Sequence, residues 1–192
     1  IGISDINIRD NIFRNGPNAL WILGHENGPY PNTNTLQRVR FVNNLIHGMD
    51  ARGVSAGGRV SPIGISPNGR SGCTVFVAMG MESLIVRSNT IYDFKGNAPT
   101  LLCADSTSNG ANAGLEIRDN IYTGSPAALS ATTAAAGAEA FNALWTEHPT
   151  PAWMVTNNVF CCNPTANTTS TTPPGNSWAP SLSAIGFVNP AG

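Results

Sequence analysis

An eight-residue phrase recurs five times along this chain. It reads apolar, any residue, apolar, two further residues, asparagine, and then a pair that is mostly hydrophobic. The copies are Ile6–Phe13, Val39–Ile46, Leu84–Ile91, Leu115–Tyr122 and Trp153–Phe160. A strand pattern of period 2, inside a unit that repeats every few tens of residues, is typical of a solenoid whose neighbouring units bury one another's apolar faces.

The spacing of the phrases indicates stacked coils of strands. Their asparagines are Asn11, Asn44, Asn89, Asn120 and Asn158, whose numbers differ by 33, 45, 31 and 38. The shorter intervals fit one coil of about three strands, and the longer ones fit a coil with insertions. The segments between phrases are too short and too poor in helical periodicity to be the crossover helices of an α/β sheet. We therefore expect an all-β solenoid of about five parallel coils.

We interpret the repeated asparagines as structural. An asparagine at the same turn of successive coils tolerates a left-handed backbone and can bond to its equivalents above and below. Such a ladder fixes the register of the coils without taking part in chemistry.

Two segments depart from the repeat within what we expect to be a single domain, 1–192. Residues 134–146 are Ala-rich with apolar side chains at helical spacing, which predicts a short inserted helix. Residues 165–181 are dominated by Thr, Ser, Asn and Pro, which predicts a long loop carrying Trp178.

Composition narrows the class of protein. The 192 residues are 41% hydrophobic and carry a formal net charge of -1, so one domain with a continuous core is expected and nucleic acid is not expected as a partner. No segment has the roughly 20 apolar residues of a membrane helix. The chain enters a strand phrase almost at once, so we expect a processed chain or an excerpt of a longer one.

The four cysteines lack the spacing of a metal site, and no metal is predicted. Cys73 and Cys103 lie about one repeat apart, where adjacent strands, about 4.8 Å from each other, are close enough for a disulfide. The alternative is two stacked buried thiols. For the adjacent Cys161 and Cys162, a bond to each other and free or otherwise oxidised thiols are both left open.

The phrases Ile-Arg-Asp-Asn-Ile, Val-Asn-Asn-Leu-Ile, Arg-Ser-Asn-Thr-Ile and Thr-Asn-Asn-Val-Phe resemble the repeats of right-handed parallel β-helix proteins of the pectate-lyase-like superfamily. The ending, residues 183–192, is similar to the last coil of secreted bacterial β-helix proteins. The resemblance implies a secreted, periplasmic or cell-surface protein with a groove along one stacked sheet that binds or cleaves a polysaccharide. It also implies that Ca²⁺ is a cofactor of lyase members, whereas the residues themselves indicate none.

Aligning the coils on the asparagines gathers titratable side chains after two of the phrases. Stacking is expected to set His47 over Tyr92 and Asp50 over Lys95, with Asp93 close by. A base, carboxylates and cations on one edge are what proton abstraction from a uronate requires. The predicted catalytic residues are His47, Asp50, Arg52, Tyr92, Asp93 and Lys95, with His47 or Lys95 as the base and Arg52 and Asp50 as orienting groups. The alternative is a solvated turn edge, where an Asp50–Lys95 pair contributes about 0–1 kcal/mol.

A second column of charge, Arg9, Arg87 and Arg118, is expected to point outward from the phrase strands and, with Trp178, to bind an acidic sugar chain. The alternatives are a solvated ladder of Arg and Asp side chains, and a Trp178 packed over the edge of the coils. The competing function is a non-catalytic subunit of a larger assembly, with the β-helix as a rigid spacer.

Overall fold

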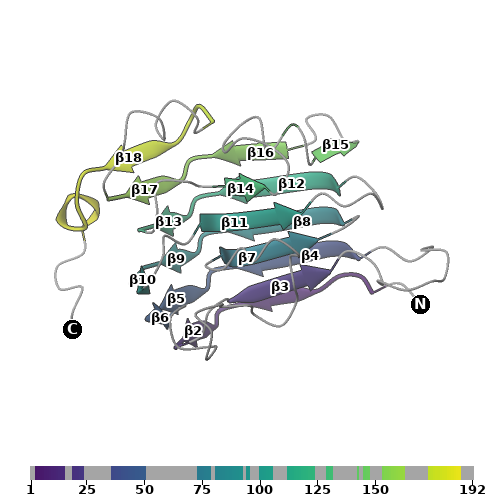
Figure 1. Ribbon diagram of the computed structural model, residues 1–192, viewed down its shortest axis with the longest axis horizontal. Helices are drawn as coiled ribbons and strands as arrows, with labels where there is room; N and C mark the ends of the chain where they lie inside the picture. Colours follow the sequence, from purple (N-terminus) through teal and green to yellow (C-terminus); the bar gives the residue numbers. More distant parts are fainter. Residues whose placement is uncertain are drawn as a thin grey trace.

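The computed structural model describes residues 3–15, 19–23, 36–50, 73–78, 81–92, 94–95, 100–105, 112–123, 129–131, 142, 145–147, 153–162 and 173–186. Strands dominate this part of the chain, and they pair into stacked sheets (Figure 1). Sheets A and B hold the phrase strands, so the phrases determine which strands lie side by side.

Sheet A contains the first strand of each phrase. Its order is β1 (Asn7–Arg9), β4 (Gln37–Val42), β8 (Glu82–Arg87), β12 (Asn112–Arg118) and β15 (Trp145–Glu147), and β16 (Trp153–Thr156) also pairs with β12. Sheet B contains the hydrophobic pairs that follow the asparagines. Its members are β2 (Ile12–Arg14), β5 (Leu45–His47), β9 (Thr90–Ile91), β13 (Ile121–Tyr122), β17 (Val159–Cys161) and β18 (Ser177–Ala179).

Two further sheets hold the strands between phrases. Sheet C contains β3 (Leu20–Leu23), β7 (Cys73–Ala78), β11 (Thr100–Asp105) and β14 (Leu129–Ala131). Sheet D is the pair β6 (Met49–Asp50) and β10 (Phe94–Lys95). The described pairings within all four sheets are parallel, and the chain passes from sheet A to B to C repeatedly in that order. The prediction of an all-β, parallel architecture is confirmed.

The asparagine ladder is present at the corner between sheets A and B. In each step, the Oδ1 of one phrase asparagine accepts hydrogen bonds from the backbone N–H and the Nδ2 of its equivalent in the preceding repeat. For Asn89, these bonds from Asn44 are 2.9 and 3.0 Å long. The Nδ2 of Asn89 then donates to the carbonyl of Phe41 and to Oδ1 of Asn120. Asn44, Asn89, Asn120 and Asn158 are all at most 2% exposed.

The ladder supplies a hydrogen-bond acceptor for the backbone N–H of each phrase asparagine at the corner. The backbone N–H of Ser88, just before the corner, bonds to Arg118 in the following repeat, whereas the N–H of Thr90, just after it, bonds to Asn44 in the preceding one. The N–H of Asn89 lies where this direction reverses, and the side chain of Asn120 accepts it. Because a buried backbone N–H is costly without a partner, the asparagine is needed at each corner.

The left-handed residue at this corner was misassigned from the sequence. The residues with positive φ are those that precede the asparagines, namely Asp10, Asn43, Ser88, Asp119, Asn157 and Gly175. The reversal of the backbone therefore falls one position earlier than predicted, and the asparagine acts through its side-chain bonds.

The core lies behind sheets A and B. Apolar residues that alternate along the strands of sheet A point inward, among them Phe41, Leu84 and Ile117, and they meet Ile91 and Phe160 from sheet B. Alternation with period 2, read in the five phrases, accounts for this core.

The structure describes part of each of the two segments that depart from the repeat. Most of the helix predicted near 134–146 lies outside the described residues. Asn142 is helical, whereas Trp145 and Thr146 belong to strand β15, so the helix ends before the predicted residue. Within the predicted loop 165–181, residues Ser177–Ala179 form β18 against β17, because Asn176 adds another step to the ladder. In the described part of the chain, no helix has the length and apolarity to cross a membrane.

The cysteines occupy two places. Cys161 and Cys162 are bonded to each other in a disulfide at the end of β17, and Cys161 is buried. The register of β7 and β11 sets Cys73 opposite Thr100 and Cys103 opposite Phe76. The bond between Cys73 and Cys103 stays a prediction, because their side chains lie outside those described.

Candidate functional site

A crease crosses sheet A where its strands bend in register. Asp5, Arg38, Ser83 and Gly114 have φ angles of 61, 54, 63 and 62°, in the left-handed region that most residues avoid. The strand register places these four residues in one column, one on each successive strand or its extension. The same bend repeated in neighbouring strands folds the sheet surface into a crease that runs across the strands.

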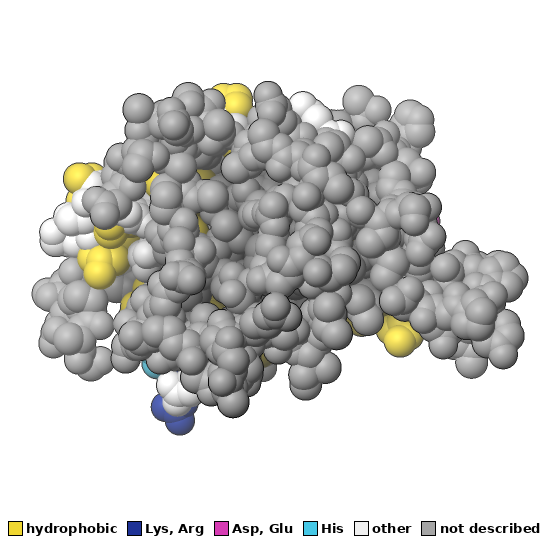
Figure 2. Space-filling model, in the orientation of Figure 1, with side chains coloured by type: hydrophobic (Ala, Val, Ile, Leu, Met, Phe, Trp, Pro, Cys, Tyr) yellow, Lys and Arg dark blue, Asp and Glu magenta, His cyan; other side chains and the backbone are white. Residues whose placement is uncertain are grey.

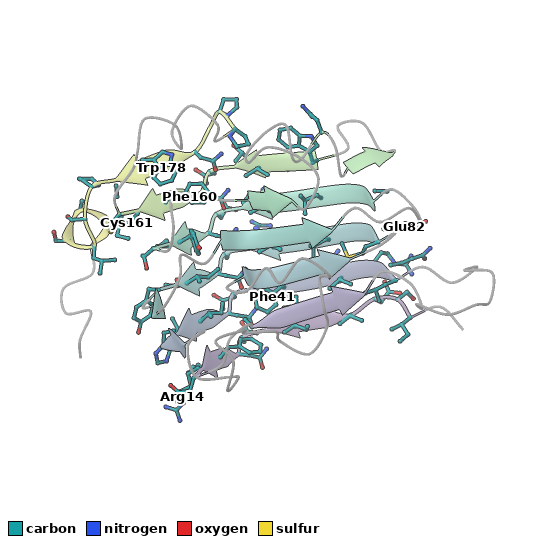
Figure 3. All side chains as sticks on the ribbon, in the orientation of Figure 1. Arg14, Phe41, Glu82, Phe160, Cys161 and Trp178 are labelled. Atoms are coloured by element: carbon teal, nitrogen blue, oxygen red, sulfur yellow. A yellow bond between two sulfur atoms is a disulfide. The ribbon has the colours of Figure 1, made fainter. Side chains whose placement is uncertain are left out.

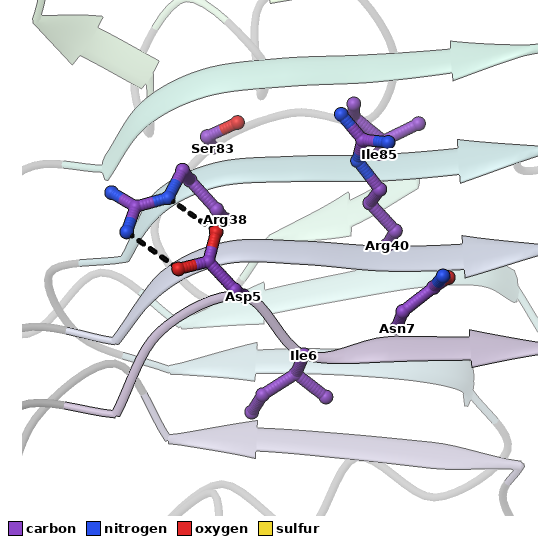
Figure 4. Close-up of a pocket in the computed structure, with 7 residues that line it drawn as sticks. All are labelled: Asp5, Ile6, Asn7, Arg38, Arg40, Ser83 and Ile85. Carbon is purple, nitrogen blue, oxygen red and sulfur yellow. Dashed lines mark hydrogen bonds and ion pairs between the residues drawn. The ribbon is translucent and has the colours of Figure 1, made fainter.

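Two pockets follow this crease. The first has a volume of about 370 Å³ and is lined by Asp5, Ile6, Asn7, Arg38, Arg40, Ser83 and Ile85 (Figure 4). The second, of about 290 Å³, is lined by Ser83, Leu84, Ile85, Gly114, Leu115, Glu116 and Met154. Because they share Ser83 and Ile85, we treat them as one surface feature, the sheet A groove.

The wall of the groove at β1 and β4 holds an ion pair. Nε of Arg38 donates to Oδ1 of Asp5 over 2.6 Å, and Nη2 of Arg38 donates to Oδ2 over 2.8 Å. These bonds from Arg38, together with one from the Ser4 hydroxyl, lower the pKa of Asp5 from 3.8 to about 2. Arg38 is therefore held in place by a two-pronged pair and keeps little capacity for a further anion.

Arg40 differs from Arg38 in having no such partner. No side-chain hydrogen bond or ion pair joins it to another residue in the part of the chain that the structure describes. Its side chain is exposed and extends from β4 toward Ile85 on β8, its neighbour in register (Figure 4). The groove thus contains a cation whose donors are open to a ligand.

The other end of the groove is apolar and charge-balanced. Met154 is 38% exposed there, and Gly114 leaves room beside Leu115. Glu116 is paired with Arg118 through the guanidinium Nε. The two ends therefore favour different parts of a ligand, an anionic group at Arg40 and an uncharged surface near Met154.

The predicted column of arginines lies beside the groove on the same face. Arg87 and Arg118 are in register with each other, and Val42 separates Arg9 from Arg87. Each arginine has an acidic partner: Arg9 Nε is 2.7 Å from Asp10 Oδ2, Arg87 Nε is 3.2 Å from Asp119 Oδ2, and Arg118 pairs with Glu116. The bond from Arg9, followed by one from Asn43, lowers the pKa of Asp10. This geometry matches the solvated Arg and Asp ladder that was the alternative to sugar binding.

The predicted catalytic residues lie on other sheets. The rings of His47 and Tyr92 stack in parallel with centroids 5.5 Å apart, and β6 and β10 pair Asp50 with Lys95. Both juxtapositions were predicted from the spacing of the phrases. Arg52 and Asp93 lie outside the described residues, as do the side chains of Asp50 and Lys95.

His47 also has a cationic neighbour. The pairing of β2 with β5 sets Arg14 opposite His47. Figure 3 shows Arg14 projecting from the lower edge of the molecule, and Figure 2 shows dark-blue atoms beside a cyan histidine at that place. The His47 edge is therefore separate from the sheet A groove.

The ring of Trp178 packs inward. Its centroid is 5.2 Å from that of Phe160, and the residue packs against the core cluster. Its Nε1 is buried and has no hydrogen-bond partner among the residues that the structure describes. This is the packing that was the alternative to sugar stacking.

Sequence reasoning missed Arg38, Arg40, Ser83 and Asp5 as site residues. Arg40 occupies the second position of its phrase, between two core residues, where Asn7, Ile85, Glu116 and Met154 stand in the others. A comparison of these outward positions between phrases would have identified Arg40 as the one cation among the five. Within the described residues, no group of three or more His, Cys, Asp or Glu side chains is arranged to hold a metal ion.

Comparisons with protein-family models, curated proteins and solved structures found no match to this chain. The groove and its arginine are therefore the basis for a functional proposal.

Proposed function

We propose that this protein is an extracellular right-handed parallel β-helix that binds an acidic polysaccharide along the sheet A groove. The observation that carries the proposal is the exposed Arg40, which has no ion-pair partner among the described residues and lies in a groove that crosses the strands. The repeated passage from sheet A to B to C, with parallel pairing throughout the described strands, supports the β-helix.

Because the groove crosses the strands, it favours a ligand chain that is bound by protein side chains and not by the backbone. Peptides commonly bind a sheet by adding a strand to its edge, through backbone hydrogen bonds. Inside sheet A those backbone groups are already paired between strands, and the groove offers the side chains of Asn7, Ser83 and Arg40 instead. Amide and hydroxyl groups of this kind suit the many hydroxyls of a sugar chain.

Nucleic acid fits this face poorly. The arginines beside the groove are matched by acidic side chains, and the net charge of the chain is -1. Affinity for a nucleic acid backbone depends on many uncompensated cations.

An extracellular setting is supported by two features. The structure contains a disulfide, Cys161–Cys162, and disulfides form and persist mainly in oxidising compartments. Only 11% of residues are charged, so neutral polar side chains supply most of the surface polarity.

The test is binding of a panel of neutral and acidic polysaccharides, measured by affinity electrophoresis and calorimetry. We expect binding of acidic polymers, and at least a tenfold loss in the variant Ile85→Trp, which places a bulky ring where the two pockets meet. Ile12→Trp is the control, since Ile12 is 66% exposed on sheet B and lines neither pocket. Absence of binding across the panel, or equal binding by both variants, would favour a spacer or assembly role instead.

A second candidate function is lyase chemistry at the His47 edge, with a uronate as substrate. The stack of His47 on Tyr92, and the register of Asp50 with Lys95, favour it because a base and a cation come together there. The assay is absorbance from unsaturated products with the same panel. If the rate were equal in wild type and His47→Ala, His47 would not be the base.

A further inference from the structure

The groove presents its outward side chains in a fixed sequence. Across the strands, Asn7 is followed by Arg40, Ile85, Glu116 and Met154, each opposite the next in register. Neighbouring strands are about 4.8 Å apart, so this column spans roughly 19 Å. A ligand lying in the groove meets these groups in that order.

Only one position in this column offers an open cation. Arg40 has no ion-pair partner among the described residues, and the neighbouring Arg38 is engaged by both oxygens of Asp5. A guanidinium presents donors in a planar fork that matches the two oxygens of a carboxylate. The half-buried Ile85 beside it lowers the exposure of such a pair to water.

Two strands further on, the groove disfavours a second carboxylate. Glu116 lies there, roughly 10 Å from Arg40 along the column. Its charge is balanced by Arg118, which is also 3.9 Å from Asp119. An additional carboxylate of the ligand at this point would lie beside Glu116, whose cationic partner Arg118 is already shared with Asp119. The next residue in the column is the apolar Met154.

We propose that the groove selects an acidic sugar chain whose carboxylates are separated by uncharged residues, with one carboxylate bound by Arg40 and a neutral sugar over Glu116 and Met154. This proposal rests on the proposed function and adds the order of charges along the ligand.

The experiment compares three oligosaccharides of equal length in calorimetric titrations. One alternates uronate and neutral sugars, the second is the same chain with its carboxyl groups reduced, and the third carries a uronate at each position. We expect the alternating chain to bind most tightly. Arg40→Gln should weaken its binding by about tenfold to a hundredfold, and should leave binding of the reduced chain unchanged.

The matched control is Arg14→Gln, an exposed arginine on sheet B that lines neither pocket. Glu116→Gln should improve binding of the uniformly acidic chain more than that of the alternating chain. Circular dichroism of each variant checks the fold.

The outcomes separate the two proposals. If all three oligosaccharides bind, Ile85→Trp abolishes binding and Arg40→Gln behaves like Arg14→Gln, the carboxylate subsite is wrong while the groove stands. Preference for the uniformly acidic chain would overturn the inferred order of charges. If none of the three binds, the proposed function itself fails.

Discussion

A phrase asparagine such as Asn89 has every polar atom of its side chain in use. Its oxygen accepts two hydrogen bonds from Asn44, and its amide donates two, to Phe41 and Asn120. These four bonds match the full capacity of an amide side chain. Since the residue is 1% exposed, water cannot replace a partner that is lost.

Replacement of Asn89 by Leu should therefore lower the melting temperature by several degrees. The backbone N–H of Asn44 and the carbonyl of Phe41 would each lose a partner, at about 1–3 kcal/mol for each unsatisfied group. Differential scanning calorimetry is the measurement. The control is Asn11→Leu, because Asn11 is exposed at the end of the described ladder, and the backbone N–H of residue 11 would still donate to Oδ1 of Asn44. Equal melting temperatures for the two variants would contradict a stabilising role of the buried ladder.

The stabilisation of the fold by the Asp5–Arg38 pair should depend on pH. Its pKa in the folded protein is lowered from 3.8 to about 2, chiefly by hydrogen bonds from Arg38. Because the folded pKa lies below the unfolded one, the pair stabilises the fold above about pH 4, and this stabilisation is lost as the pH falls toward 2. A carboxyl NMR titration should give a midpoint for Asp5 near 2, and Arg38→Gln should move it upward toward 3.8. A midpoint that stays near 2 in the variant would show that Arg38 is not the cause.

At the scale of elements, sequence reasoning succeeded where one repeat determined the next. The phrases fixed which strands are neighbours, and this was enough to place His47 on Tyr92 and Asp50 beside Lys95. It failed where the backbone bends. Asp5, Arg38 and Ser83 have different side chains, yet each has a positive φ at the same register position of neighbouring strands or their extensions. A groove formed by such a column has no signature in a single phrase.

In the segment around β18, the structure is more regular than the sequence predicted. Its composition predicts a loop, but Asn176 accepts from Asn158 over 3.0 and 2.8 Å and extends the ladder. The local signal is Gly175, which supplies the left-handed residue ahead of an asparagine at φ 83°. Glycine adopts this conformation without the cost that other residues incur.

Gly175→Ala should destabilise the protein more than Gly186→Ala does. Both glycines have φ near 85°, at 83 and 87°, so both variants incur the cost of a left-handed alanine, about 1–2 kcal/mol. At Gly175 the added Cβ would also lie 2.7 Å from Oγ1 of Thr156, whereas at Gly186 it meets nothing within 4 Å. The free energies of unfolding, measured by urea denaturation, should therefore differ between the variants. An equal loss of unfolding free energy in Gly175→Ala and Gly186→Ala would mean that the Thr156 side chain can move away from the added Cβ without an energetic cost.

At the scale of the whole molecule, the apolar side chains of each repeat pack against those of the neighbouring repeats. Val39, Leu84, Leu115 and their equivalents form one continuous cluster from β4 to β17. The sequence predicted this core because alternation in the phrases separates inward from outward positions. The sequence also indicated a solvated ladder of Arg and Asp side chains on the outer face. It did not assign Asp119 as the partner of Arg87, because these two side chains come from different repeats.

A mutation in the middle of the stack tests whether the repeats unfold together. Ile91 in β9 is fully buried, and Ile91→Ala should cost about 2–5 kcal/mol of unfolding free energy. The exposed Ile12 of the same sheet is the control, for which Ile12→Ala should cost at most about 0.5 kcal/mol. In a stack, stability is the sum of the repeats and of the interfaces between them, and strong interfaces make unfolding concerted. Because the buried cluster is continuous across these interfaces, Ile91→Ala should shift the urea midpoints of tryptophan fluorescence and far-UV circular dichroism by the same amount. If the two midpoints separated in this variant, the repeats on either side of β9 would be independent folding units, and the continuous core would not couple them.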